Sequence, residues 1–320
     1  MRRLRTAAPT FFHTPGGAWM RRGGSCHQTG SALLAVFWAI AVLSMAVGGW
    51  FLWLQERVQA HGEESRGAEA LAMAHSGVAM AMNPQVDRYS SLLTTEVAPG
   101  VGYRVEMEGE AGRLNLVSIL GGEPGWIYLF KQWLEFVIGM ELQDRDRLVD
   151  CLLDYVDADS IVRLNGQEDG ADYHPANRMI QSLDELKRIP GTGLLLAYPG
   201  WRELLTVDGS GLIDLAEAPE ELLKLLPGLG DGQVTRLVQM RAGTDGVLHT
   251  EDDPQFANAE AVRQALGIQS QQWARFGKMV TAGEQTFRIK SEGRSGKVVR
   301  QVQVVVRKGA GAPRILSWIE

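Results

Sequence analysis

Acidic side chains between residues 144 and 172 are the groups in this sequence best suited to chemistry. Nine carboxylates occur there against three arginines. Carboxylates at this density repel one another unless water or a cation screens them, and their hard oxygen atoms favour calcium. The sequence therefore predicts a calcium-binding loop, with a solvated acidic loop as the alternative. The predicted ligands are Asp157, Asp159, Glu168, Asp169 and Asp172.

Three of these residues are spaced as in an EF-hand. Asp157, Asp159 and Glu168 stand where positions one, three and twelve of that loop would fall. The sixth position, where an EF-hand needs glycine for its sharp turn, is Val162. The pattern excludes a regular EF-hand and leaves a less regular calcium loop.

A second acidic loop is expected between two helices at residues 243–253. It contains two glycines, so backbone oxygen atoms are accessible beside its carboxylates and the loop is a second calcium candidate. Its predicted ligands are Asp245, Glu251, Asp252 and Asp253. His249 lies in the same loop with no other histidine or cysteine near it in the sequence, which argues against a transition-metal site.

Residues 212–241 resemble a helix–hairpin–helix, with the turn Leu-Pro-Gly-Leu-Gly at 226–230. Backbone N–H groups at such a turn can hold a phosphate, which raises DNA binding as a hypothesis. DNA binding also needs cations, and Lys224, Arg236 and Arg241 are outnumbered by five carboxylates in this segment. We therefore expect a packing module and no nucleic-acid partner. The alternative function is a membrane-anchored DNA-binding protein of a competence or type IV pilus system.

Catalytic motifs are missing from the sequence. It contains no H-E-x-x-H, no G-x-S-x-G and no Walker sequence. Its two cysteines, Cys26 and Cys151, are too few for a disulfide scaffold or a cysteine-based metal site. The chain has 45% hydrophobic and 22% charged residues, as globular proteins do, and its net charge of −6 is unlike that of a nucleic-acid binder. We expect neither an enzyme nor a small-molecule substrate.

The segment Ser31–Leu54 carries no charged side chain and is predicted to cross a membrane. Its 24 residues span roughly 36 Å as a helix, enough for a hydrocarbon core of about 30 Å. The 30 residues before it carry five arginines and no acidic residue. The positive-inside rule therefore predicts a single-pass protein with a cytoplasmic N-terminus and the bulk of the chain outside the cytoplasm.

The junction of Gly30 with Ser31 resembles that of a type IV prepilin leader, in which a short basic segment ends in glycine directly before an apolar helix. We expect cleavage here, which removes residues 1–30 and retains the transmembrane helix at 31–54. Because Met20 precedes an arginine pair, residues 1–19 are interpreted as a start-site extension. An uncleaved anchor is the alternative.

The helix is predicted to continue past the membrane as far as Asn83-Pro84, since proline cannot extend it. Its polar part keeps one apolar stripe, which we expect to be an assembly surface for partner helices. The stripe consists of Ala68, Leu71, Val78 and Met82.

Alternating patterns predict strands on both sides of a helical block. Tyr103–Glu108, with Arg113–Val117 as its hairpin partner, precedes the block, and 287–290, 302–306 and 314–318 follow it, with a turn at Glu292–Gly296. The helices are predicted at Trp126–Ile138, Arg145–Val156, Leu183–Arg188, Pro219–Leu226, Gly232–Arg241 and Asn258–Leu266. The fold class is therefore α+β. A long N-terminal helix packs on an antiparallel sheet formed within 55–122 and 273–320, and an all-α domain is inserted at 123–272.

Six segments, taken in order, make the chain resemble the K-type minor pseudopilins of the type II secretion system (general secretion pathway protein K). They are Gly30–Leu54, Glu-Ala-Gly-Arg-Leu-Asn-Leu at 110–116, Leu-Asp-Tyr-Val-Asp-Ala-Asp at 153–159, Gly-Gln-Glu-Asp-Gly-Ala-Asp-Tyr at 166–173, Ser-Leu-Asp-Glu-Leu at 182–186 and Gly-Leu-Ile-Asp-Leu-Ala-Glu-Ala-Pro at 211–219.

The resemblance implies a pilin-like fold whose insertion contains SAM-like helical hairpins. It implies a place at the tip of a periplasmic pseudopilus, where the protein initiates and caps the filament during export across the outer membrane. The implied partners are the I-type and J-type minor pseudopilins, the major pseudopilin, the prepilin peptidase and the inner membrane, and the implied modification is methylation. Calcium in the helical domain is implied as well.

One position bears on assembly. Ala35 would be the fifth residue after cleavage, where major pilins carry a glutamate that pairs with the N-terminal amine of a neighbouring subunit. The K-type family resembled here lacks that glutamate. A tip subunit has no neighbour above it and needs no such carboxylate, so Ala35 is counted with the assembly residues.

Overall fold

The computed structural model describes residues 29–170, 172–309 and 311–320. The chain divides at His61 into an N-terminal unit and a unit formed by residues 62–320. Most of the predicted leader, with Cys26, lies outside the described residues, and Gly30 and Ser31 fall in the first turn of the first helix.

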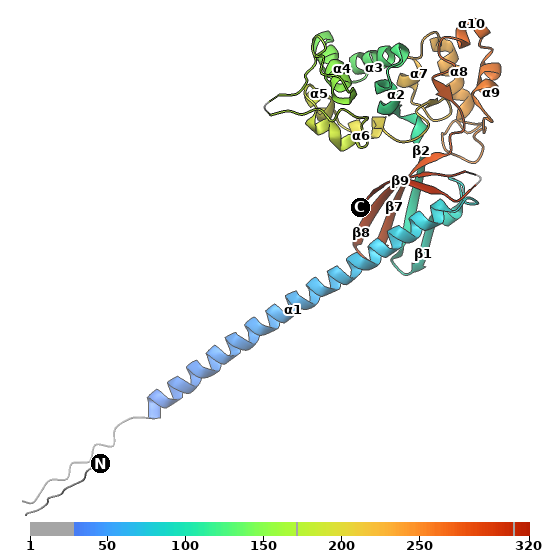
Figure 1. Cartoon of the computed structure of the whole chain (residues 1–320). Coiled ribbons are helices and arrows are strands. Elements are labelled where there is room, and N and C mark those ends of the chain that lie inside the picture. The colour runs from blue at the N-terminus through green and yellow to red at the C-terminus, as the bar shows by residue number, and fades with distance from the viewer. Residues whose placement is uncertain (1–28, 171, 310) are drawn as a thin grey trace, which may run out of the picture. The chain divides into compact units, whose positions relative to one another are not determined.

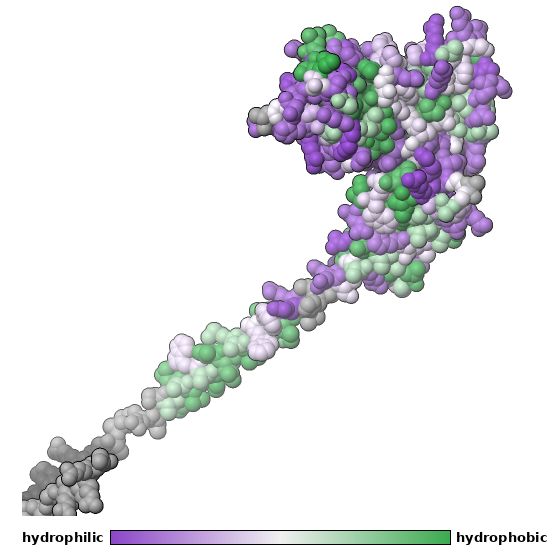
Figure 2. Space-filling view, viewed as in Figure 1, coloured by the Kyte–Doolittle hydropathy of each residue, from purple (hydrophilic) through white to green (hydrophobic). Residues whose placement is uncertain are grey.

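Helix α1 runs from Thr29 to Met82 and ends where Asn83-Pro84 predicts. In the N-terminal unit its apolar side chains between Leu33 and Leu54 are exposed, and Figure 2 shows them as a green surface. Within the described part of the chain, α1 is the one helix long and apolar enough to cross a membrane. It fits the predicted single-pass anchor.

A five-stranded antiparallel sheet in the order β1-β2-β7-β8-β9 confirms the predicted α+β fold (Figure 1). The strands are β1 (Thr94–Ala98), β2 (Val101–Gly109), β7 (Thr286–Ser295), β8 (Val298–Arg307) and β9 (Arg314–Ile319). Side chains alternate between the two faces of each strand, and the β-branched ones at Ile289, Val302 and Val304 are fully buried against α1. The predicted turn at Glu292–Gly296 begins too early, because β7 continues to Ser295 and only Gly296 has a positive φ.

The C-terminal part of α1 approaches this sheet closely because of two glycines. A Cβ on Gly77 would lie 2.3 Å from Ser291 Oγ, and one on Gly293 would lie 1.9 Å from the carbonyl oxygen of Ala70. The hydroxyl of Ser291 donates a 2.8 Å hydrogen bond to the carbonyl of Ala74. Small residues at these positions thus allow backbone-to-backbone packing.

The same packing corrects our expectation for the apolar stripe of α1. Val78 is only 2% exposed and belongs to the core between α1 and the sheet, and Leu71 and Met82 pack against that core. Only Ala68 is exposed. The stripe is therefore used within the chain, because the sheet needs an apolar cover, and it is not a free assembly surface.

The prediction that Arg113–Val117 pairs with β2 as a hairpin is also wrong. Residues Leu114–Asn115 form a short strand, β3, that pairs in parallel with β4 (Leu205–Thr206), while β2 pairs with β1 and β7. The side chain of Asn115 then accepts hydrogen bonds from the N–H groups of Val117 and Ser118 and so starts helix α2.

The segment between β2 and β7 is mainly helical and has its own apolar core. It also contains the parallel pair β5 (Ile213–Asp214) and β6 (Val280–Thr281). Its helices are the 3-10 helix Glu110–Gly112, α2 (Leu116–Leu120), α3 (Pro124–Phe136), α4 (Leu142–Val156), the 3-10 helix Leu183–Arg188, α5 (Gly193–Ala197), α6 (Trp201–Leu204), α7 (Glu220–Leu223), α8 (Asp231–Arg241), α9 (Ala259–Leu266) and α10 (Ser270–Trp273).

Buried ion pairs join this helical segment to the sheet. Arg288 on β7 donates to both carboxylate oxygens of Glu110, at 2.7 and 2.9 Å, and both residues are buried. Arg113 donates to the same carboxylate at 3.3 Å. Since each partner would be costly to bury alone, these pairs hold the start of the insertion against the sheet.

Candidate metal centre

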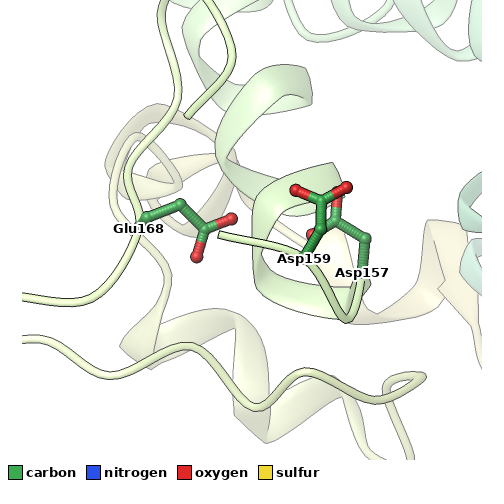
Figure 3. Close-up of side chains that lie close together, drawn as sticks. All are labelled: Asp157, Asp159 and Glu168. Atoms are coloured by element: carbon green, nitrogen blue, oxygen red, sulfur yellow. The ribbon is translucent and has the colours of Figure 1, made fainter. Parts of the chain in front are cut away.

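Three carboxylates of the first acidic loop converge at the end of α4. Asp157 is the C-cap of that helix, Asp159 follows in the next turn, and Glu168 returns from the far end of the loop. One oxygen of each lies within 4.8 Å of the other two, and Figure 3 shows the three side chains together. This is the grouping that the sequence spacing predicts.

Two oxygen atoms of this group are buried without a hydrogen-bond partner, namely Asp157 Oδ1 and Glu168 Oε1. Glu168 is only 9% exposed. Burial first, and then the charges of Asp154 and Asp157, raise the pKa of Glu168 above its usual range. Buried carboxylate oxygens without donors are costly, so the arrangement fits a hard cation such as calcium.

The guanidinium of Arg163 supplies part of the compensating charge. Its Nη1 donates to Oδ1 of the fully buried Asp154 at 2.5 Å and also contacts Oδ2 of Asp157. Arg163 therefore occupies one oxygen of Asp157 and leaves the other free. Our sequence prediction missed both Asp154 and Arg163, although Asp154 lies one helical turn before Asp157 and could have been found from that spacing.

Close contacts fix the return of the loop onto α4. A Cβ on Gly166 would lie 1.9 Å from Asp154 Oδ2, so only glycine fits there. Next to it, the backbone N–H and the side-chain amide of Asn165 donate to Asp150 Oδ2, at 3.1 and 2.9 Å. The loop is thus held at the two residues just before Gln167 and Glu168.

The other predicted ligands of this loop lie outside the converging group. Asp169 and Asp172 are exposed, and Asp169 contacts the ring of His174. The structure brings together three of the five predicted residues.

In the second acidic loop the carboxylates close the loop with hydrogen bonds. Asp252 Oδ2 accepts from the N–H and hydroxyl of Thr244, at 2.6 and 2.7 Å, and Asp253 Oδ2 accepts from the N–H of His249 at 2.6 Å. The bonds from Thr250 and Thr244 lower the pKa of Asp252. Residues Asp245, Glu251, Asp252 and Asp253 form no converging group, and the described residues contain no second one.

The predicted helix–hairpin–helix is a packing module in the structure. The turn leading into α8 is covered by Gln272, whose amide donates to the carbonyl of Gly228 at 2.5 Å. Arg241 is buried and donates to the carbonyls of Leu215 and Ala218, so it is not available to a phosphate. Lys224 is paired with Glu220 at 2.8 Å. These contacts favour the packing interpretation over DNA binding.

A charged junction that sequence reasoning missed lies at Glu217. Its carboxylate pairs with Arg88 at 2.7 Å and with His249 at 3.3 Å, two residues far apart in the sequence. Burial opposes ionisation, but the hydrogen bond from His249 and the charge of Arg88 outweigh it and lower the pKa of Glu217 to about 2. The junction ties the segment after α1 to the second acidic loop.

Comparisons with known proteins agree with this architecture. Residues 112–194 match the model of the family described as type II secretion system (T2SS), protein K. No curated protein matches the sequence. A chain in the crystal structure of the GspK–GspI–GspJ complex from the enterotoxigenic Escherichia coli type 2 secretion system is similar in structure, with a TM-score of 0.56 and 11% identity over 83% of this chain and 98% of that one. Both comparisons agree with the resemblance seen in the sequence: residues 112–194 are similar to the type II secretion protein K family, and the chain shares the fold of a chain in the GspK–GspI–GspJ complex.

Proposed function

We propose that this protein is a minor pseudopilin that assembles with I-type and J-type minor pseudopilins at the tip of a type II secretion pseudopilus, where it initiates and caps the filament. The observation that carries the proposal is the match of residues 112–194 to the protein K family within an insertion on a pilin-like sheet. The similarity to a chain of the GspK–GspI–GspJ complex supports the choice of partners.

Two features of the chain suit a cap. The insertion between β2 and β7 adds bulk that a regular helical filament has no room to repeat at every subunit. Ala35 lacks the carboxylate that would pair with a subunit above it. Neither feature suits a subunit of the filament shaft. We propose no catalytic role for the protein.

The test of this proposal is assembly of the full chain with its partners in a membrane. Co-expressed with the I-type and J-type proteins, it should purify as a small complex of defined stoichiometry. Gold labelling should find it at one end of each filament. Long homopolymers, or label spaced along the shaft, would contradict the proposal while leaving the fold intact.

We further propose that Asp157, Asp159 and Glu168 bind calcium. The free oxygens of Asp157 and Glu168 support this. Calcium at 100 times its Kd would stabilise the fold by about 2.7 kcal/mol. EGTA should therefore lower the melting temperature of the full chain, and Asp157→Asn and Glu168→Gln should remove this response. Asp169→Asn, at an exposed residue beside the site, should keep it. A melting temperature indifferent to calcium in the parent protein would exclude the site.

Processing completes the proposal. Cleavage between Gly30 and Ser31 by the prepilin peptidase, followed by methylation, would leave a single-pass inner-membrane protein with its bulk in the periplasm. Mass spectrometry of the mature N-terminus tests this directly. The variant Gly30→Val should remain uncut, because the peptidase would meet a bulky side chain at the cleavage position. Normal processing of that variant would contradict the prepilin interpretation.

A further inference from the structure

The loop between Asp159 and Glu168 presents its residues in an unusual way. The charged side chain of Arg163 turns inward, onto Asp154 and Asp157. The three apolar side chains around it turn outward. Ile161 is 75% exposed, Val162 56% and Leu164 96%. Together these three residues form the apolar tip of the loop.

The contacts beneath the apolar tip hold it in this orientation. On one side the N–H of Ile161 donates to Asp159 Oδ1 at 2.8 Å. On the other side Asn165 is held by Asp150, and Gly166 lies against Asp154. Arg163 fastens the middle of the loop. The exposure of the apolar tip is therefore fixed by the fold around the three proposed calcium ligands.

The tip is too small to be a protein interface by itself. A stable protein–protein contact needs about 800 Å² from each partner, supplied by about 20–30 residues a side. Three side chains on one loop fall far short of this. They are sufficient for shallow insertion into a lipid surface, where each apolar side chain that is fully buried contributes about a tenfold change in partition.

The negative charge of the carboxylates beneath the tip would oppose such an insertion unless a cation offsets it. The tip stands on Asp157, Asp159 and Glu168, which would repel an anionic lipid surface. A bound calcium ion would offset that charge. Calcium takes six to eight oxygen ligands. Because Arg163 already engages one oxygen of Asp157, that carboxylate offers the ion only its other oxygen. Coordination positions on the ion would therefore remain for phosphate oxygens.

We propose that the apolar tip is a calcium-dependent docking site for the surface of an anionic phospholipid bilayer. The inference rests on the calcium site of the proposed function. Ile161, Val162 and Leu164 enter the lipid surface, and the calcium ion held by the carboxylates beneath them attracts lipid phosphates.

The experiment uses the full chain inserted in nanodiscs of neutral phosphatidylcholine. Binding of separate vesicles is measured with calcium or with EGTA. One set of vesicles is phosphatidylcholine alone, and the other contains phosphatidylglycerol. Calcium should raise binding to the anionic vesicles at least about tenfold and should leave binding to the neutral ones low.

Two triple variants test whether vesicle binding depends on the apolar tip or on exposed apolar side chains in general. Ile161→Ser/Val162→Ser/Leu164→Ser should bind calcium as the parent does in a calorimetric titration but lose vesicle binding. The matched control Phe136→Ser/Leu142→Ser/Leu194→Ser changes side chains that are 67%, 64% and 52% exposed elsewhere, and it should bind vesicles as the parent does.

Each outcome is informative. If the parent binds no calcium, the proposed metal site fails and the inference fails with it. If the parent binds calcium but not vesicles, or if the tip variant binds vesicles normally, the inference alone is wrong. If the tip variant instead weakens the complex with the minor pseudopilins while vesicle binding is absent, the tip is a protein contact and the lipid proposal is overturned.

Discussion

Replacing Glu217 by glutamine should destabilise the fold and flatten its dependence on pH. Glu217 is 14% exposed and pairs with Arg88 and His249. Its pKa falls from 4.5 to about 2 in the folded chain. A shift of one pKa unit corresponds to about 1.4 kcal/mol, so ionised Glu217 contributes about 3 kcal/mol.

The direction of the pH effect follows from the lowered pKa. The unfolded chain binds a proton at Glu217 more readily than the folded chain does. This contribution to stability is therefore fully present above about pH 5 and is lost as the pH falls towards 2. The neutral amide of Glu217→Gln has the same size but no proton to gain, so its stability near pH 7 is lower and the slope in this window is smaller.

The measurement is chemical unfolding of the full chain in detergent, followed by tryptophan fluorescence at several pH values between 7 and 3. The control is Glu220→Gln, which breaks an exposed pair with Lys224 and should have no clear effect. An unchanged free energy of unfolding for Glu217→Gln at pH 7, together with an unchanged slope, would refute the reasoning.

Three further predictions concern packing, buried charge and calcium binding. Gly77→Ala should lower the free energy of thermal unfolding by about 1–3 kcal/mol, because its Cβ would clash with Ser291 and Val105. The control Gly67→Ala should be neutral or slightly stabilising, because its Cβ would meet only the flexible end of Arg300. Glu110→Gln should cost about 3–5 kcal/mol in urea unfolding because the buried Arg288 would keep only its longer pair with the half-exposed Glu203. A cost under 1 kcal/mol would contradict the role given to the pair of Arg288 with Glu110. Because the pKa of Glu168 is raised, calorimetric titrations of the parent protein should find that calcium affinity begins to fall at a higher pH than at a site with ordinary carboxylates. A parent affinity that does not change with pH would count against Glu168 as a ligand.

Local patterns were enough to predict most of the fold. The alternation of Tyr103, Val105 and Met107 marks a strand because one side of it is covered by α1, and Pro84 marks the end of that helix because proline cannot continue it. The hairpin at Arg113–Val117 failed for a local reason as well. Asn115 uses its side chain to begin a helix, and a strand propensity scale does not include that bond.

The part of the candidate site that depends only on the spacing of residues could be predicted from the sequence. Asp157, Asp159 and Glu168 meet because a short loop returns to the helix end that it left. Asp252 and Asp253 do not converge with other carboxylates, because N–H groups and hydroxyls of the loop donate to their oxygen atoms. This arrangement depends on backbone conformation, which the spacing of residues does not show. Glu217 could not be found from the sequence, since its partners Arg88 and His249 come from distant segments.

The long separation between β2 and β7 determines the order in which the protein can be built. In the sheet Val101 pairs with Ser295, about 190 residues further along the chain. Lys308, close to the C-terminal end, donates to the carbonyl of Ala81 in the last turn of α1 and to that of Val86 just after the helix. During synthesis α1 and β2 are therefore made long before β7 and β8, which complete the cover of the apolar face at Val78. The insertion can form its own core in the meantime, and by drawing its two ends together it reduces the loop-closure entropy that the final strand pairing has to overcome.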